Sequence, residues 1–242
     1  YQPYTGIPEL RQAFADWYKR YYGVELSPEE ILPLIGSKEG ILHISLTFLN
    51  VGDGVLVPNP GYPTYTSVSA LMRANIIPYD LREDDHWQPD FEALEKMDLS
   101  GVKLMWVNYP NMPTGANASR ELFEKLVAFG KKHQIIICHD NPYSFILNDR
   151  PMSILSVDGA KDICIELNSM SKAHNMPGWR MGMLASNTQF VKWILREKSN
   201  IDSGQFKPLQ VATVAALSNP PEWYARMNKL YAERRGIAEK IM

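Results

Sequence analysis

The chain has 242 residues, with 25 basic and 27 acidic side chains and a formal net charge of −2 at pH 7. Hydrophobic residues make up 45% and charged residues 21%, which is typical of a folded globular protein and argues against disorder, collagen and coiled coil. No block of like charge is present, and the apolar runs are too short to span a bilayer. We therefore expect neither a nucleic-acid partner nor a membrane surface.

Only two cysteines occur, Cys138 and Cys164, and both lie in apolar runs. This number excludes a disulfide scaffold and favours a reducing compartment. We expect a cytoplasmic protein in which both thiols are buried and unreactive.

Short apolar runs alternate with longer amphipathic ones along most of the chain. Apolar residues at helical spacing, with Pro8 in the first turn and Gly23 after the last, predict a helix over Pro8–Tyr22. A strand over Ile31–Ile35 and a helix from Ser37 to about Asn50 follow. The remaining predicted strands are Val55–Val57, Ile76–Tyr79, Val102–Val107, Ile135–His139, Ile163–Leu167 and Met181–Ala185, and the remaining predicted helices are Tyr65–Arg73, Phe91–Met97 and Ser119–His133.

The last part of the chain has a different sequence pattern. From Thr188 to Met242 the pattern is helical, with breaks at Ser203–Pro208 and Asn219–Pro221. Strands that alternate with helices predict an α/β fold with three layers, α/β/α, around a mostly parallel central sheet. We expect residues 1–215 to form one large domain and residues 216–242 to begin a helical connection to a small C-terminal domain.

Polar residues gather just after four of the predicted strands. They are Ser37 and Lys38, Asn108–Gly115, Asp140 and Tyr143, and Ser169, Ser171 and Lys172. In open parallel sheets, ligands bind beyond the carboxyl ends of the strands, so we expect these residues to line one crevice. A lysine at such a place, held in an apolar pocket, can form a Schiff base with a carbonyl cofactor. No metal-ligand spacing is present, and we expect no metal site.

Six motifs follow one another in a specific order: YQPYTGIPELRQA, GSKEGI, PNPGYPTY, NYPNMPTG, DNPY and SMSKAHNMPGWRMG. Together they cover nearly the whole chain, and the sequence resembles the class I/II aminotransferases, the fold-type I pyridoxal-phosphate enzymes that include aspartate aminotransferase. The resemblance implies the large, cofactor-binding domain of a pyridoxal-phosphate-dependent enzyme. It also implies amino-group transfer between an L-amino acid and a 2-oxo acid.

The resemblance assigns roles to individual residues. Lys172 is the Schiff-base lysine that shuttles the Cα proton, Asp140 faces the pyridinium nitrogen, and Tyr143 donates a hydrogen bond to the phenolic oxygen of the ring. An anion at Asp140 keeps the ring protonated, so that it can act as an electron sink. The other implied cofactor contacts are Ser37, Lys38, Ser169, Ser171 and Arg180 at the phosphate, Tyr62 stacked on the ring, Asn111 near the phenolic oxygen, and Tyr1 at the phosphate of a neighbouring subunit. The position of Tyr1 implies a homodimer with shared sites.

The sequence departs from the family pattern at Met112, where the family has an asparagine that contacts the phenolic oxygen. Asn111 or Asn108 takes over that contact, or Tyr143 makes it alone. Pro113 is expected to follow a cis peptide bond. The family's arginine for the substrate α-carboxylate lies in a C-terminal domain, beyond the last residue of this sequence, so we expect the chain to be one domain of a longer enzyme.

Several alternatives remain open. The same scaffold supports β-elimination, C–S lysis and decarboxylation, and a non-catalytic regulatory domain can also bind the cofactor. Asp140 can serve as a turn cap and Ser37 as an ordinary N-cap. His139 is expected to be a satisfied core histidine, and Lys198 a solvated surface group.

Overall fold

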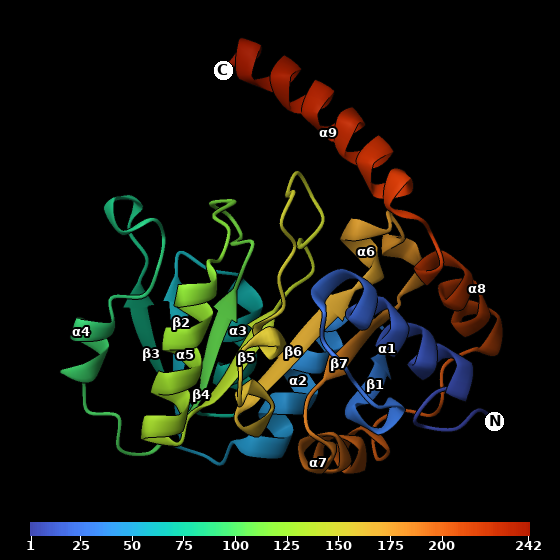
Figure 1. Cartoon of the computed structure of the whole chain (residues 1–242). Helices are drawn as coiled ribbons and strands as arrows, with labels where there is room; N and C mark the ends of the chain where they lie inside the picture. Colours follow the sequence, from blue (N-terminus) through green and yellow to red (C-terminus); the bar gives the residue numbers. More distant parts are fainter.

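Seven strands form one sheet through the middle of the molecule (Figure 1). The structure is a computed structural model that describes residues 1–242. Across the sheet the strand order is β1-β7-β6-β5-β4-β2-β3. The strands are β1 (Ile31–Leu34), β2 (Gly54–Asn59), β3 (Asn75–Asp80), β4 (Val102–Asn108), β5 (Ile136–Asp140), β6 (Cys164–Ser169) and β7 (Gly182–Ala185).

The sheet is mostly parallel, as the sequence predicts. Strands β6, β5, β4, β2 and β3 pair in parallel, in that spatial order. Strand β7 runs antiparallel to both of its neighbours, β1 and β6. The carboxyl ends of β1, β4, β5 and β6 therefore lie along the same edge of the sheet.

The predicted helices are present, with ends that shift by a few residues. They are α1 (Pro8–Tyr22), α2 (Ser37–Phe48), α3 (Pro63–Leu71), α4 (Phe91–Glu95), α5 (Arg120–His133), α7 (Thr188–Lys198), α8 (Lys207–Leu217) and α9 (Pro221–Ile241). A short helix that the sequence analysis does not predict, α6 (Met170–Ala173), follows β6. The hydroxyl of Ser119 accepts a hydrogen bond from the Leu122 amide at 3.0 Å and so caps α5. The break after α7 begins at Ser199 and is longer than the sequence predicts.

Helices cover both faces of the sheet and create two hydrophobic cores. One core contains apolar residues of α2, α3 and α7, and the other contains apolar residues of α1 and α5. Cys138 lies in the first core and Cys164 in the second; both are free thiols, and burial raises the pKa of each. The three-layer fold expected from the sequence is thus confirmed.

Helix α9 leaves the body of the molecule and projects beyond the carboxyl ends of the strands (Figure 1). Only one of its residues, Tyr224, is buried. The Tyr224 hydroxyl accepts a hydrogen bond from Trp17 Nε1 at 2.9 Å and lies 2.8 Å from His174 Nε2. Burial lowers the pKa of His174 to about 4, so its neutral ring accepts the Tyr224 hydroxyl. These contacts join the base of α9 to α1 and to the segment after α6.

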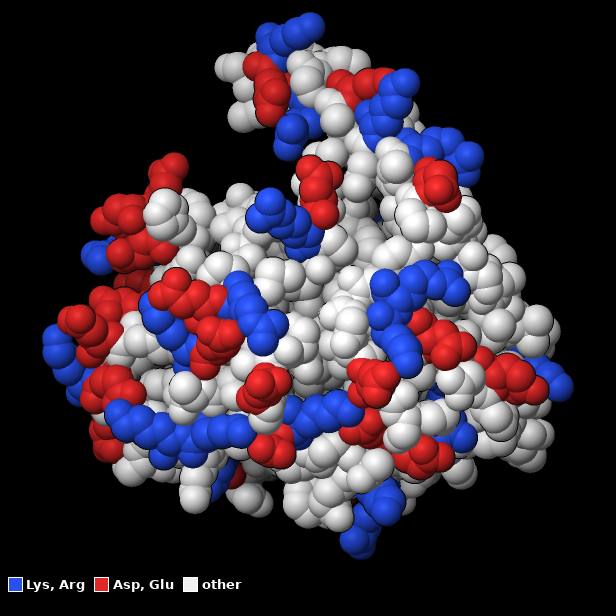
Figure 2. Space-filling view, in the orientation of Figure 1, with Lys and Arg blue, Asp and Glu red and all other residues white.

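Charged side chains of both signs are interspersed over the face shown in Figure 2. No helix combines the length and apolar character that crossing a bilayer requires. No group of three or more His, Cys, Asp or Glu side chains is arranged to hold a metal ion.

Candidate active site

The four strand ends with polar residues meet at one cavity of about 410 Å³. Its lining residues are Ser37, Lys38, Tyr62, Tyr65, Asn108, Met112, Asp140, Pro142, Tyr143, Ser169, Ser171, Lys172, Pro177 and Arg180. Nine of the eleven residues that the sequence nominates for the cofactor lie on this lining. The cavity therefore lies beyond the carboxyl ends of the strands, as expected for an open parallel sheet.

Asp140 ends β5 and is buried at the floor of this cavity. Its Oδ2 atom accepts a hydrogen bond from the Tyr65 hydroxyl at 3.0 Å, whereas its Oδ1 atom has no partner. Burial raises the pKa of this carboxyl to about 6, although the hydroxyl of Tyr65, the charge of His139 and the hydroxyl of Ser37 oppose the rise. Asp140 therefore offers one free acceptor atom to whatever enters the cavity.

Tyr65 is a site residue that the sequence reasoning misses. It lies three positions after Tyr62, which directly precedes the first residue of α3. This spacing was the available signal. The Tyr65 ring stacks on Trp106 at a centroid distance of 5.1 Å, which holds its hydroxyl toward Asp140.

Lys172 follows β6 directly, within α6. Its Nζ atom lies 5.6 Å from the centre of the Tyr143 ring, so the two side chains share the same part of the cavity. The expectation of an apolar pocket around this lysine is wrong, because Lys172 is exposed and most of the lining is polar. Burial raises the pKa of Tyr143, and the nearby Asp140 adds to the rise.

An anion-binding arrangement lies at the start of α2. No side chain caps this helix, and Ser37 and Lys38 of its first turn line the cavity, so its first amides are available to an anion there. Ser37 begins the helix, and the Ser169 hydroxyl, at the end of β6, accepts a hydrogen bond from the Ser171 amide at 3.2 Å. These hydroxyls and amides are suitable donors for a phosphate group.

Arg180 brings a positive charge to the same place. Its Nη1 atom donates to the Pro177 carbonyl at 2.7 Å, and its Nη2 atom donates to the Ile35 carbonyl at 2.9 Å. Gly36 has a φ of +107°, and a Cβ atom there would lie 2.4 Å from Nη2 of Arg180. Only glycine at position 36 leaves room for the guanidinium group in this position.

A buried ion pair holds the backbone of the segment that begins α2. Glu39 accepts the Ile35 amide at 2.7 Å and the Lys198 ammonium group at 3.0 Å. Burial alone would raise the pKa of Glu39, but His43, Lys198 and the Ile35 amide outweigh it and lower the pKa to about 2. The expectation that Lys198 is a solvated surface group is wrong: it is 1% exposed, because its charge is paired in the interior.

Tyr62 and Lys38 lie together at the cavity rim. The Lys38 Nζ atom is 5.4 Å from the centre of the Tyr62 ring. Burial alone would raise the pKa of Tyr62, but Lys38 and the Thr64 hydroxyl outweigh it, and the pKa is lowered. The ring of Tyr62 packs edge-on against Tyr65 at a centroid distance of 5.7 Å.

Two nominated residues lie outside the cavity. Asn111 is buried and lines a neighbouring cavity, because its Oδ1 atom accepts the Thr114 hydroxyl at 2.8 Å within the turn. Tyr1 is fully exposed at the start of the chain. Asn108 does line the cavity, but it donates to the Asp140 carbonyl and accepts the Met112 amide, each at 2.7 Å. The peptide bond before Pro113 is cis, as expected.

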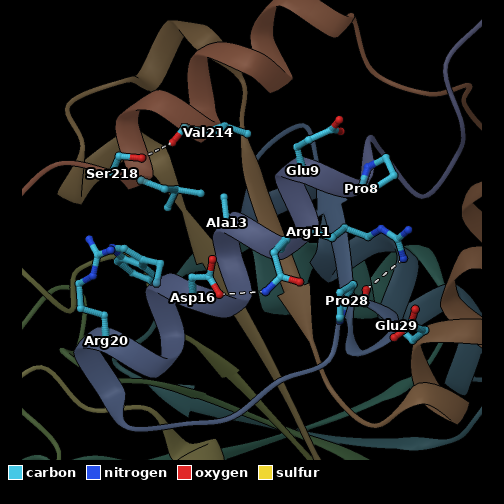
Figure 3. A pocket seen from close by; sticks show the side chains of 13 residues that line it. Pro8, Glu9, Arg11, Ala13, Asp16, Arg20, Pro28, Glu29, Val214 and Ser218 are labelled. Carbon is cyan, nitrogen blue, oxygen red and sulfur yellow. Dashed lines mark hydrogen bonds between the residues drawn. The ribbon is translucent and has the colours of Figure 1, made fainter.

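The largest cavity, of about 640 Å³, is elsewhere and lies between α1, α8 and the 3₁₀ turn Pro28–Glu30 (Figure 3). Figure 3 shows that two of its charged side chains pair with groups of the cavity wall: Arg11 donates to the Pro28 carbonyl at 3.1 Å, and Asp16 accepts from Gln12 at 2.9 Å. None of the nominated cofactor residues lines it. The largest hollow of the molecule is thus not the candidate site.

The residues of the smaller cavity match the chemical groups of pyridoxal 5'-phosphate. The free Oδ1 atom of Asp140 suits a protonated ring nitrogen, and the Lys172 amine suits an aldehyde. The uncapped start of α2, the serine hydroxyls and Arg180 suit a phosphate dianion. The one polar group of the ring without an obvious amide partner is the phenolic oxygen, because Met112 stands where the resemblance expects asparagine.

Comparison with protein families agrees with this arrangement. The family described as "Aminotransferase class I and II" matches residues 1–240. An LL-diaminopimelate aminotransferase of Dehalococcoides mccartyi is 44% identical over 238 residues, which are 97% of this chain and 61% of that protein. One from Aquifex aeolicus is 42% identical over 245 residues, which are 100% of this chain and 63% of that protein.

Solved structures give the same picture. Apo-BacF from Bacillus subtilis superposes with a TM-score of 0.94 at 40% identity and covers 97% of this chain and 60% of its own. Aspartate aminotransferase from Thermus thermophilus with maleate superposes with a TM-score of 0.93 at 26% identity and covers 99% of this chain and 63% of its own. The chain therefore spans about three fifths of the length of these relatives.

Proposed function

Because the chain belongs to the class I and II aminotransferase family, we propose that it binds pyridoxal 5'-phosphate in this cavity and moves an amino group between an amino acid and a 2-oxo acid. Enzymes of this family use pyridoxal 5'-phosphate. One observation carries the proposal: an exposed lysine, a buried carboxylate with a free oxygen and an anion-binding helix start all face one cavity.

Pyridoxal 5'-phosphate supplies, when bound, an aldehyde that condenses with amines and a protonated ring that takes up electron density from the substrate Cα. The Oδ1 atom of Asp140 holds the proton at the ring nitrogen. The hydroxyls of Ser37 and Ser169 and the guanidinium group of Arg180 bind the phosphate, with Lys38 and Ser171 beside them. These contacts fix the position of the ring before any substrate arrives.

Lys172 is the group that moves protons. As a free amine, its Nζ atom would accept the Cα proton of the substrate and later return a proton, as a general base and then a general acid. The hydroxyl of Tyr143 would donate to the phenolic oxygen, and Tyr62, which also lines the cavity, would contact the ring of the cofactor. Met112 leaves Tyr143 to hold that oxygen without an asparagine.

The relatives suggest the first substrate to test. Several proteins that are 42–44% identical to the chain are LL-diaminopimelate aminotransferases, so we propose LL-diaminopimelate as amino donor. We also propose that residues 1–215 form the cofactor-binding domain, that residues 216–242 begin a connecting helix, and that the protein works in a reducing compartment. The projection of α9 and the two free buried thiols support these points.

We propose in addition that the active unit is a homodimer in which Tyr1 reaches the site of the partner. Tyr1 is fully exposed, and Gly204 packs against the carbonyl oxygens of Gln2 and Pro3, so the segment after α7 lies beside the N-terminus. Ile201 and Phe206 of that segment are exposed apolar residues. A second copy of the chain would cover them.

The test is a half-reaction with the purified chain loaded with pyridoxal 5'-phosphate. On addition of LL-diaminopimelate, we expect stoichiometric loss of the aldehyde and appearance of pyridoxamine 5'-phosphate, identified by mass. The Lys172→Ala variant should show no conversion on the same timescale. Release of pyruvate and ammonia from amino acids would instead indicate elimination, and cofactor binding without any conversion would contradict amino-group transfer by this chain.

A further inference from the structure

A second buried ionic group lies directly behind the candidate site. Successive side chains of a strand point to opposite faces of the sheet. Asp140 faces the cavity, so its neighbour His139 faces the opposite side, where it packs edge-on against Phe123 of α5 at a centroid distance of 5.0 Å. Glu166 of β6 is the register partner of His139. Both side chains are completely buried.

Both ring nitrogens of His139 face oxygen acceptors. Nε2 lies 2.9 Å from the Tyr109 carbonyl oxygen, and Nδ1 lies 2.8 Å from Glu166 Oε2. A carbonyl oxygen carries no proton, so Nε2 must be the donor. Glu166 Oε2 also accepts the Ile154 amide at 2.9 Å, and Oε1 accepts the Tyr18 hydroxyl at 2.8 Å.

This pattern suits an ion pair. The Ile154 amide and the Tyr18 hydroxyl already donate to Glu166, one to each oxygen, and an ionised carboxylate has a further acceptor site on Oε2 for Nδ1. A histidine that donates from both nitrogens is an imidazolium cation. His139 and Glu166 therefore form an ion pair in which every polar atom has a partner, the condition under which buried charges persist.

The other titratable groups near the pair are neutral. Tyr18 and Tyr22 come from α1, and Cys164 comes from β6. Burial raises the pKa of all three, and the negative charge of Glu166 adds to the rise.

The pair links the three strand ends that carry the cavity residues. His139 precedes Asp140 on β5, and the Tyr109 carbonyl follows β4 at the turn that leads to Met112. Glu166 lies three positions before Ser169 on β6. The positive charge of His139 also favours the ionised form of Asp140 and limits the rise in its pKa that burial causes.

We propose that His139 is a positioning residue: its imidazolium, paired with Glu166 behind the sheet, holds the ends of β4, β5 and β6 together and keeps Asp140 anionic for the cofactor's ring nitrogen. The part that concerns the ring nitrogen rests on the proposed function. His139 itself touches neither cofactor nor substrate, and it acts through Asp140.

The first experiment needs no cofactor. In the ligand-free chain labelled with ¹⁵N-histidine, the side-chain spectrum of His139 at pH 7, assigned by its absence in His139→Gln, should show two protonated nitrogens. The ¹³C signal of the Asp140 carboxyl, assigned with Asp140→Asn, should titrate at a pH about one unit higher in His139→Gln than in the wild type, a tenfold change in its dissociation constant. A neutral His139 ring at pH 7, or an unchanged Asp140 titration, would overturn the proposal.

Tyr18→Phe is the matched control, because it removes one hydrogen bond to Glu166 and keeps the ion pair. It should leave the Asp140 titration at the wild-type pH. A shift as large as that of His139→Gln would show that loss of any hydrogen bond to Glu166 moves the Asp140 titration, and this result would refute a role for the charge of His139. Should His139→Gln not fold, Glu166→Gln replaces it, since loss of the counter-charge should leave His139 neutral and shift Asp140 in the same direction.

The second experiment adds pyridoxal 5'-phosphate. At pH 5, below the titration of Asp140 in either chain, the wild type and Tyr18→Phe should bind it with equal affinity, and His139→Gln should bind it about tenfold more weakly because its Asp140 is less ionised. Equal affinity in all three chains would contradict the proposal. If the wild type binds no cofactor, the proposed function fails, whereas the ligand-free spectra still decide the charge of His139 and its effect on Asp140.

Discussion

The carboxyl group of Asp140 is buried, and one of its oxygen atoms accepts no hydrogen bond from the chain. Burial raises its pKa to about 6, whereas a carboxyl in the unfolded chain titrates near 3.9. Between these values the folded state binds more protons than the unfolded state, so the free energy of unfolding falls as the pH rises from about 4 to about 6. Above that range the ligand-free protein is less stable by about 3 kcal/mol because of this one group.

The Asp140→Asn substitution should stabilise the protein, whereas most substitutions of buried residues destabilise it. Without cofactor at pH 8 we expect it to be more stable than the wild type by up to about 3 kcal/mol, since it removes an unpaired buried charge. At pH 4, where the wild-type carboxyl is protonated, the two should be nearly equal. Urea unfolding at both pH values measures the difference, and a variant less stable than wild type at pH 8 would contradict this account of Asp140.

Gly36 is the residue that leaves room for the guanidinium group of Arg180. Gly36→Ala should displace that group and weaken binding of pyridoxal 5'-phosphate by about 10- to 100-fold, the loss of one charge-assisted hydrogen bond to the phosphate. Gly101→Ala is the matched control: Gly101 also has a positive φ, of +80°, but a Cβ atom there has no neighbour within 4 Å. Titration of the cofactor by absorbance compares them, and equal affinities would show that the Gly36–Arg180 contact does not serve the phosphate.

At the scale of residues, the sequence predicts best where the chemistry requires one residue type in one motif. Lys172, Asp140 and Arg180 are found this way, and all three line the cavity. Tyr65 is missed because a tyrosine in an apolar helix resembles a core residue. The burial of Lys198 is missed because its partner Glu39 is far away in the sequence.

At the scale of elements, periodicity places the seven strands and the longer helices, but it misses the short α6 and does not give strand direction. β7 is antiparallel, and nothing in Met181–Ala185 distinguishes it from the parallel strands. The direction follows from the connection, because the short helical segment α6 after β6 does not form the longer crossover that a parallel neighbour needs. Local sequence patterns also do not predict contacts between residues that are far apart in the sequence, such as the contact of Tyr224 with Trp17.

The base of α9 depends on the Tyr224 hydroxyl, which links Trp17 and His174. Tyr224→Phe should cost about 1–3 kcal/mol, because two buried polar groups lose their partner. Amide hydrogen exchange should also become faster in the first turns of α9, with a smaller change in the sheet. Tyr231→Phe, on the same helix and without a hydrogen bond to another residue, should change neither quantity, and equal effects of the two variants would contradict the assignment.

At the scale of the whole molecule, exposed apolar side chains gather around the N-terminus. Tyr1 and Tyr4 lie there. Ile201 and Phe206 belong to the segment after α7, which packs against residues 2–3. Sedimentation velocity should show a dimer for the wild type and a monomer for the double variant Ile201→Glu/Phe206→Glu. Val51→Glu, at an exposed apolar residue elsewhere, should remain dimeric; a monomeric wild type would contradict the homodimer.

The central claim is that Lys172 bonds to pyridoxal 5'-phosphate in the cavity at the strand ends. The most direct measurement is borohydride reduction of the chain mixed with the cofactor, followed by digestion and mass analysis of the modified peptide. We predict one equivalent of reduced cofactor on the peptide that contains Lys172, and none in Lys172→Ala. Labelling of other lysines to the same extent, or undiminished labelling of the variant, would contradict the claim.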